Sequence, residues 1–222
     1  LIGNYDQARE TVKNALTIRR KMDFEYEVAQ SLSTLGEIER FSSRLRQAGD
    51  CYKRSTEIFR TLRAYDWEAI LWHQRAENAR RVAKAEQLYE FSDEERVQKY
   101  MGYAVLDIEH SLELYETYRL RRDRQRAWRR YGEIMSDFGE LDQAKESLLK
   151  AFRLADEGQN QQEALESLIT LAELSIRQGR YEEAEEYLNR IDTYQEAFHY
   201  DVFTGLKKVY RAKLLLAKEE YD

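Results

Sequence analysis

The side chains that most often carry out catalysis or bind metals are few and scattered in this 222-residue chain. Its three histidines are His73, His110 and His199, and their separations match no metal-binding spacing. The single cysteine, Cys51, precedes Tyr52, and we interpret it as a small buried residue rather than a nucleophile. The chain contains neither a glycine-rich phosphate loop nor a nucleophile-elbow motif. These observations predict a protein without enzymatic activity, metal or cofactor.

Charged side chains follow a more regular pattern, because glutamates recur at equivalent positions along the chain: Glu37, Glu77, Glu133 and Glu173. Together with their neighbours one helical turn away, they form the predicted partner-binding set: Glu37, Arg40, Phe41, His73, Glu77, Arg80, Arg81, Arg129, Glu133, Glu173 and Arg177. Two interpretations remain open. The glutamates pair with residues three or four positions later in their own helix, as Glu77 with Arg80 and Arg81, or the set recognises a charged or amphipathic protein segment.

A dense arginine cluster contains seven arginines within the twelve residues 119–130. One interpretation is a docking patch for an acidic protein surface, formed by Arg119, Arg121, Arg122 and Arg124. The plainer interpretation is a solvated loop with charges at the helix ends. Contact with phosphate or nucleic acid is a third interpretation. The net charge of −6 argues against it, and so does the lack of interleaved stacking aromatics other than Trp128, which the register places in the core.

The elements that position these residues are revealed by small side chains that recur along the chain. One column is Ala8, Ala48, Ala104, Ala144 and Ala184, in steps of 40, 56, 40 and 40 residues. The same steps separate Gly36, Ala76, Gly132, Ala172 and Ala212, and again Ala15, Ser55, Ser111, Ala151 and Ile191. A fixed period of this length predicts stacked supersecondary units, with one 16-residue excess.

The composition predicts that these units are helical. The chain has no proline, which would break helix interiors, and 35% of its residues are charged. In residues 125–154 an apolar stripe at helical spacing includes Trp128 and Tyr131, and Gly139 can end this first helix. A second stripe follows from Ala144. Each unit is therefore predicted to be a pair of antiparallel helices.

One stretch joins Trp128-x2-Tyr131-Gly132 to Gly139-x-Leu141-Asp142-Gln143-Ala144 and Leu148-x2-Ala151, and it resembles the tetratricopeptide repeat (TPR) family. Residues 29–58 and 165–191 repeat the pattern. The resemblance implies an all-α, right-handed superhelical solenoid of antiparallel helix pairs, with about eleven helices. It also implies that the first helix of each pair lines a groove that receives a protein segment. The 40-residue period, against the usual 34 with a proline, indicates the long-repeat subclass.

We expect residues 1–222 to form one repeat array. The expected units are 1–23 (partial), 24–64, 65–122, 123–159, 160–199 and 200–222 (partial). The N-terminal unit supplies only a second helix, and the C-terminal unit only a first helix, around Val209, Ala212 and Leu215. Because both ends fall inside a unit, we expect the chain to be a fragment of a longer protein.

The 16-residue excess lies between Ala83 and Ala104. Ser92-Asp93-Glu94-Glu95 has the form of a capping box, which places a turn near 91–92. About eight extra residues per helix then predict a hairpin extension over about 84–99. It is either a harmless variation in repeat length or a docking or dimerising finger. Aromatic and apolar residues near its tip favour burial against a partner: Tyr89, Phe91, Val97, Tyr100 and Met101.

Charge and hydropathy narrow the functional classes. No apolar run approaches the roughly 20 residues that span a bilayer, and no signal peptide is visible. A single cysteine is compatible with a reducing compartment, so we expect a cytoplasmic or other reducing intracellular location. The predicted function is a non-catalytic scaffold that binds a protein or peptide segment in the groove. The alternative is a ligand- or peptide-sensing regulatory domain of a larger signalling protein, such as a transcription regulator or NTPase.

Overall fold

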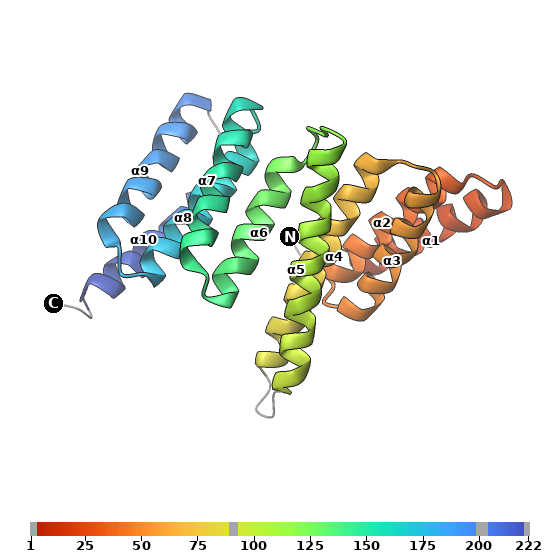
Figure 1. The fold of residues 1–222 in the computed structure, drawn as a ribbon, viewed down its shortest axis with the longest axis horizontal. Coiled ribbons are helices and arrows are strands. Elements are labelled where there is room, and N and C mark those ends of the chain that lie inside the picture. Colours follow the sequence, from red (N-terminus) through yellow and green to blue (C-terminus); the bar gives the residue numbers. More distant parts are fainter. Residues whose placement is uncertain (1–3, 89–92, 199–203, 220–222) are drawn as a thin grey trace. The chain divides into compact units, whose positions relative to one another are not determined.

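The computed structural model describes residues 4–88, 93–198 and 204–219, and all regular structure in these ranges is α-helical (Figure 1). Ten helices are present there, one fewer than the eleven expected. Two compact units divide them, residues 1–122 and 123–222. The first contains α1 (Tyr5–Lys21), α2 (Glu25–Phe41), α3 (Leu45–Thr61), α4 (Tyr65–Gln87) and α5 (Glu94–Thr117). The second contains α6 (Arg124–Phe138), α7 (Leu141–Glu157), α8 (Gln161–Arg177), α9 (Tyr181–Phe198) and α10 (Thr204–Glu219).

The turns between helices share one geometry. A residue with positive φ follows each of seven helices: Asp23, Ser43, Arg63, Arg119, Gly139, Gln159 and Gly179. These positions are 20 residues apart, except for the step of 56 that contains the insertion. The next residue donates its backbone N–H to a carbonyl five residues back, as Ala64 does to Phe59 at 2.9 Å. This is the hydrogen bond of a Schellman motif, and it ends each helix without proline.

The recurring small residues occupy equivalent positions, as the sequence predicts. Ala48, Ala104, Ala144 and Ala184 are all fully buried, and Ala8 in α1 is half-buried. A hydrogen bond also recurs in the first unit. The Ser55 hydroxyl donates to the Ala29 carbonyl and the Ser111 hydroxyl to the Ala69 carbonyl, both at 2.7 Å. Both bonds tie a second helix to the first helix of its own pair, so equivalent residues make equivalent contacts.

Glycine permits the closest approach within a pair. A Cβ atom built on Gly132 of α6 lies 2.7 Å from Leu148 Cγ and 3.0 Å from the Ala144 carbonyl oxygen of α7. Gly36 of α2 has the same relation to the Tyr52 ring of α3, at 2.6 Å. A side chain at either position would force the neighbouring Tyr52 or Leu148 side chain, or the helix that carries it, to move.

We therefore expect Gly132→Ala to lower the free energy of unfolding by about 1–2 kcal/mol, because overpacking outweighs the helix propensity that alanine gains. Chemical denaturation followed by circular dichroism measures the change. Gly102→Ala on α5 is the matched control, since nothing lies within 4 Å of a Cβ there. It should stabilise the protein by about 0.5–1 kcal/mol. Equal stabilisation by both substitutions would contradict the packing at Gly132.

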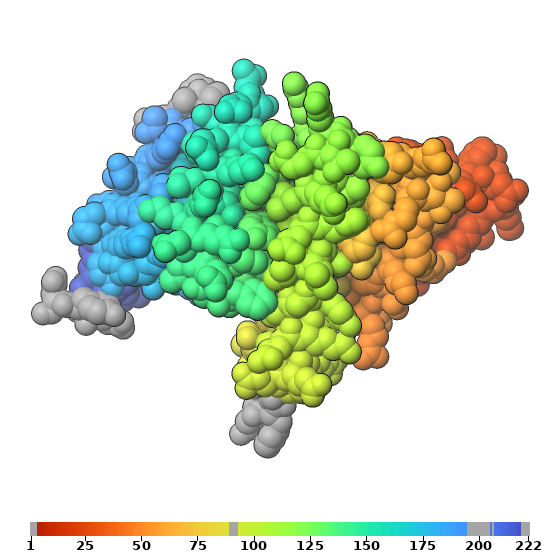
Figure 2. Space-filling view, in the orientation of Figure 1, coloured from red at the N-terminus to blue at the C-terminus, as the bar shows by residue number. Residues whose placement is uncertain are grey.

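Helices α4 and α5 are the longest of the described helices, with 23 and 24 residues against 17 in α1, α2 and α3. Figure 2 shows their yellow-to-light-green ends extending past the end of α3. The N-cap of helix α5 is Asp93, whose side chain accepts from the Arg96 backbone N–H at 3.1 Å, one residue later than the predicted capping box places it. The expected turn at 91–92 lies outside the described residues.

Three of the apolar residues expected near the tip of the extension pack between its two helices, although Leu88 at the end of α4 is 87% exposed. Val97 and Met101 of α5 are buried against Ala83 of α4, with Tyr100 half-buried beside them. This corrects the expectation that these residues await a partner, because the paired helices already cover them. The expected tip residues 89 and 91 lie outside the described residues.

Candidate functional site

The predicted partner-binding residues lie on α2, α4, α6 and α8, the first helix of each pair, but four of them are buried. They are Arg40, His73, Glu77 and Arg129. A buried side chain offers no surface to a partner, so the prediction that these four line a groove is corrected. They hold the helices together, and the exposed members of the set must be considered separately.

In the first unit, Glu77 pairs with arginines of its own helix. Its carboxylate lies 3.0 Å from Arg80 Nε and 2.6 Å from Arg81 Nε. The interpretation of pairing at spacings of three and four residues is thus confirmed for Glu77. The Arg81 side chain nevertheless stays 43% exposed, which leaves a fixed cation at the surface.

Glu37 behaves differently from the expected pairing with Arg40. It accepts a hydrogen bond from Gln74 Nε2 of α4 at 3.0 Å and remains half-buried. Arg40 instead donates to the Tyr52 hydroxyl at 3.3 Å, and its guanidinium lies 4.4 Å from the Phe41 ring centroid. Phe41 itself is exposed, so the end of α2 presents an aromatic surface beside a carboxylate.

The described residues that were singled out for chemistry, His73, His110 and Cys51, do not form a reactive group. His73 is buried with its ring nearly parallel to Tyr115, and His110 packs edge-on against Trp72 at 4.6 Å. Burial raises the pKa of the half-buried Cys51 thiol, which keeps it protonated at neutral pH. His199 lies outside the described residues. Within the described ranges no group of three or more His, Cys, Asp or Glu side chains is arranged to hold a metal ion.

The second unit contains a buried ion-pair network centred on Arg129 of α6. Its guanidinium lies 2.7 Å from Glu133 and 3.1 Å from Glu163 of α8, and it also contacts Glu166. Glu163 in turn lies 2.6 Å from Arg126 Nε. The network joins α6 to α8, and both Arg129 and Glu163 are buried.

Charge pairing outweighs desolvation in this network. Burial alone raises the pKa of Glu163, but Arg129 and Arg126 outweigh it and hold that pKa below its ordinary value. Burial likewise opposes the charged form of Arg129, while Glu133, Glu163 and Glu166 raise its pKa above the ordinary value. Both groups therefore stay charged at neutral pH. The network is structural, because its interior is closed to a partner.

The remaining candidates on α8 lie at the surface. Glu173 is half-buried and accepts a hydrogen bond from the Tyr210 hydroxyl of α10 at 2.8 Å. Arg177 is exposed and donates to the Ser136 hydroxyl of α6 at 2.8 Å. Each unit presents its own accessible candidates, which we name the first-helix face of that unit: Glu37, Phe41 and Arg81 in the first unit, and Glu173 and Arg177 in the second.

The arginine patch is divided between the two units. Arg119 forms the positive-φ turn after α5, and Arg121 and Arg122 follow it as exposed residues of the first unit. Arg122 lies 4.7 Å from the Trp67 ring centroid of the same unit. Arg124 begins α6 in the second unit. Each unit thus carries its own part of the patch.

A cluster of charged and aromatic side chains in the first unit was not predicted from the sequence. Arg75 lies 3.9 Å from the Trp72 ring centroid and 3.2 Å from Asp107 of α5. Burial raises the pKa of Asp107 to about 6, although Arg75 lowers it in part. The sequence contains a signal for Asp107, because the equivalent positions in the other repeats, 51, 147 and 187, hold the uncharged residues Cys, Ser and Tyr. Asp107 is the only carboxylate in that column.

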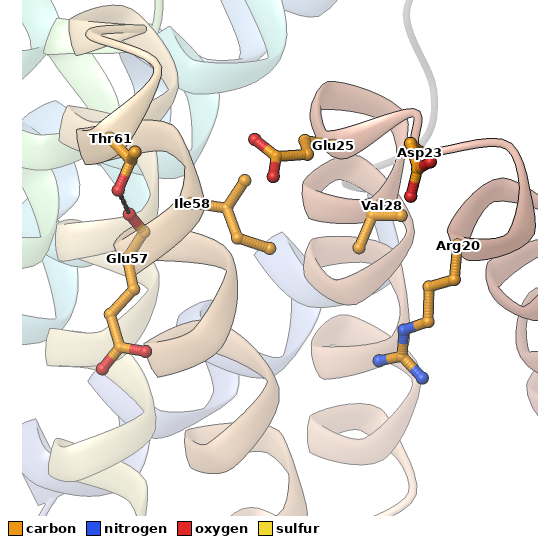
Figure 3. A pocket seen from close by; sticks show the side chains of 7 residues that line it. All are labelled: Arg20, Asp23, Glu25, Val28, Glu57, Ile58 and Thr61. Atoms are coloured by element: carbon orange, nitrogen blue, oxygen red, sulfur yellow. Dashed lines mark hydrogen bonds between the residues drawn. The ribbon is translucent and has the colours of Figure 1, made fainter.

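A surface pocket of about 380 Å³ lies where α1 and α3 end and α2 begins (Figure 3). Its lining residues are Arg20, Asp23, Glu25, Val28, Glu57, Ile58 and Thr61. The side chains of Val28 and Ile58 face each other across the pocket in Figure 3, and the charged groups lie around them. Sequence analysis did not identify it, because its residues come from three helices and share no register.

Comparisons with known proteins agree with the helix-pair architecture. A family model described as Tetratricopeptide repeat matches residues 165–198. BtubC (BKLC) from P. vanneervenii is similar in structure with a TM-score of 0.76 and 11% identity, over 99% of this chain and 86% of that one. TTC0263, a TPR protein from Thermus thermophilus, has a TM-score of 0.70 and 20% identity, over 96% and 92% of the two chains.

A Rap protein complexed with Competence and Sporulation Factor has a TM-score of 0.75 and 16% identity, over 92% of this chain. The chain spans 53% of that Rap protein. No curated protein matches the sequence significantly. Residues 165–198 are thus a tetratricopeptide repeat, and the chain has the TPR-like helical-repeat fold. No helix in the described part of the chain has the length and apolar character needed to cross a bilayer.

Proposed function

We propose that this protein is a non-catalytic interaction module that binds a protein or peptide segment along the first-helix faces of its units. The observation that carries the proposal is the contrast between buried and accessible charges on the same helices. Glu77, Arg129 and Glu163 are buried and fix the helices, while Arg81, Glu173 and other first-helix residues remain accessible. The accessible charges are the ones that a partner can contact.

The accessible side chains are held in place before any partner arrives. Arg81 is fixed by Glu77, Glu37 by Gln74, and Arg177 by Ser136. Immobilising a long side chain on binding costs roughly 0.5–1.5 kcal/mol, and this cost is reduced when the side chain is already ordered. Fixed charges also select partners, because they favour one arrangement of opposite charges over others.

The chemistry of the face indicates the kind of segment it recognises. Carboxylates and guanidinium groups occur on both units, and Phe41 adds an aromatic contact on the first. Such a mixture suits a segment that carries charges of both signs, with an apolar side chain near Phe41. The similarity to a Rap protein complexed with Competence and Sporulation Factor supports binding at the level of the fold.

We expect Phe41→Ser and Arg177→Glu to weaken binding of peptides selected from a displayed random library by at least about tenfold each. Fluorescence anisotropy with the labelled peptides measures the affinity. Leu106→Ser on α5 and Arg153→Glu on α7 are matched controls, because they make the same kinds of change at exposed positions of second helices. Arg121→Glu with Arg122→Glu tests the arginine patch separately.

The library must be selected against the folded chain, and circular dichroism must show that each variant keeps its helices. Equal affinity of the wild type and both first-helix variants would contradict the proposal. Equal losses in the matched controls would also contradict it. A loss of affinity that occurs only in the variant carrying Arg121→Glu and Arg122→Glu would contradict the proposal and would indicate that the peptide binds to the arginine patch.

A regulatory sensing domain of a larger signalling protein is the second candidate. The similarity in fold to a Rap protein complexed with Competence and Sporulation Factor favours it. The two candidates differ in what the ligand does. A sensor changes conformation on binding, so limited proteolysis with a selected peptide would give a changed cleavage pattern. A passive scaffold would be cleaved at the same sites with and without the peptide, and only the sites that the peptide covers would be protected.

A further inference from the structure

The pocket where α1 and α3 end and α2 begins is lined by an uneven set of charged groups. Its carboxylates belong to Asp23, Glu25 and Glu57, and its guanidinium belongs to Arg20. In the described part of the chain, none of these four groups forms an ion pair or a side-chain hydrogen bond. The lining therefore carries more negative than positive charge.

The charges are placed at the two ends of an apolar floor. Val28 is 8% exposed and Ile58 is half-buried. In Figure 3 the carboxylates of Asp23 and Glu25 lie toward one end of this apolar pair. Glu57 and Arg20 lie toward the other end, where their charges balance. The apolar floor thus leads to a pair of carboxylates at one end of the pocket.

The helix ends at the pocket also favour a bound cation. Helices α1 and α3 end there, whereas α2 begins there. The C-terminus of a helix carries a partial negative charge and the N-terminus a partial positive charge. Two negative helix ends therefore outnumber one positive end.

In other helix pairs, side chains bridge the equivalent place. Tyr65 of α4, which corresponds to Glu25, stacks on Tyr118 of α5 with the ring centroids 3.9 Å apart. Tyr194 of α9, which corresponds to Ile58, donates a hydrogen bond to a carboxylate near the end of α7. In the pocket these positions hold Glu and Ile, which do not span the space. Its opening therefore comes from its own lining side chains.

We propose that this pocket binds a small molecule with a primary ammonium group on a short hydrocarbon chain. The ammonium group lies between the carboxylates of Asp23 and Glu25, and the chain lies between Val28 and Ile58. The volume of about 380 Å³ is near the lower end for small-molecule sites, which favours a small ligand over a protein segment. Phe41 is at the opposite end of α2, so the proposal does not depend on the first-helix faces.

The probe is n-hexylammonium, and a ¹H–¹⁵N NMR titration of the whole chain measures its binding. For a ligand of this size we expect a Kd of about 1 mM, with shifted amides within residues 20–28 and 57–61. Hexan-1-ol has the same chain without the charge, and hexanoate has the opposite charge. Methylammonium has the charge without the chain. Each of these three should bind at least about fivefold more weakly than n-hexylammonium.

Charge-removing variants test the role of the two carboxylates. Asp23→Asn combined with Glu25→Gln should weaken n-hexylammonium binding at least about fivefold. Asparagine tolerates the positive φ at position 23, so the turn after α1 is preserved. Asp142→Asn combined with Glu146→Gln is the matched control, because it makes the same change of charge at exposed positions of α7. The control should bind like the wild type.

Ile58→Tyr introduces the residue that α9 has at the equivalent position. It should fill the pocket and weaken binding at least about tenfold. Circular dichroism establishes that every variant is folded. If Ile58→Tyr does not fold, the charge-removing pair still decides the question.

Three results would overturn the proposal. The first is an absence of amide shifts in the pocket residues of the wild type at about 20 mM n-hexylammonium. The second is equal binding of hexan-1-ol, or an equal loss in the α7 control. The third is tighter binding of Nα-acetyl-lysine methylamide than of n-hexylammonium, which would assign the pocket to a lysine side chain of a protein segment.

Discussion

Arg129→Met is expected to lower the free energy of unfolding by about 3–5 kcal/mol, the usual cost of breaking a buried ion pair from one side. Methionine preserves most of the side-chain volume but removes the cation that Glu133, Glu163 and Glu166 share. Glu163 then stays buried with Arg126 alone. Urea denaturation followed by circular dichroism measures the loss. Arg153→Met, at an exposed arginine of α7, should change stability by less than about 0.5 kcal/mol.

A second substitution separates charge from packing. Adding Glu163→Gln to Arg129→Met removes the carboxylate left in excess, so the double variant should be more stable than Arg129→Met alone. In the wild-type background, Glu163→Gln should instead destabilise the protein. Additive effects in this cycle would show that the two side chains do not interact and would contradict the network.

The pH dependence of Arg129→Met follows from the pKa of Glu163, which lies below its ordinary value in the folded state. A depressed carboxyl pKa contributes stability above the pKa of the unfolded chain, and this contribution is lost as pH falls through the folded pKa. The gap in stability between wild type and Arg129→Met should therefore be full at neutral pH. It should narrow below pH 4.5, the ordinary value for glutamate.

The second large effect concerns Asp107, whose pKa is raised to about 6 in the folded protein against 3.8 ordinarily. The protonated form is therefore favoured on folding. The corresponding stability is fully present below the unfolded pKa and is lost as pH rises through about 6. Asp107→Asn imitates the protonated form at every pH. We expect it to stabilise the protein by about 2 kcal/mol at pH 8 and to have almost no effect at pH 4.

The groups around Asp107 define the control for this measurement. Arg75 of α4 lies 3.2 Å away, and His110 lies one turn further along α5. Both proteins contain the same other titratable groups, so comparing Asp107→Asn with the wild type at each pH isolates the contribution of Asp107. The asparagine introduced by this substitution can still accept a hydrogen bond from Arg75. A stability difference that is the same at pH 4 and pH 8 would contradict the raised pKa.

The helix pairs could be predicted from the sequence because their contacts are local and repeat. Ala144 faces its own pair in the same way as Ala48, so one period carries the information for all pairs. The turns were harder, because the seven left-handed positions include Arg63 and Gln159, which give no local signal. There the Schellman hydrogen bond and helix packing impose a conformation that the residue type does not favour.

The candidate site could be predicted only in part, because burial depends on partners distant in sequence. Arg129 has the sequence context of a surface residue until Glu163, 34 residues later, is placed beside it. The equivalent residue of the next helix pair, 40 residues later, is Ile169, and an apolar residue at this position indicates that the side chain points inward. Arg177, in contrast, is exposed on the helix where the register placed it. The repeat register therefore predicts which helix carries a residue. How deeply its side chain is buried depends on tertiary contacts with residues distant in sequence.

Site-specific photo-crosslinking tests the central claim, that a protein segment binds along the first-helix faces of the units, most directly. A photoreactive residue is placed at position 41 or 177 on the first helices, and at position 106 or 153 on the second helices. Each labelled protein is irradiated with a peptide selected by the wild type. The proposal predicts crosslinks from positions 41 and 177, and none from 106 and 153. Crosslinks confined to 106 and 153 would contradict it.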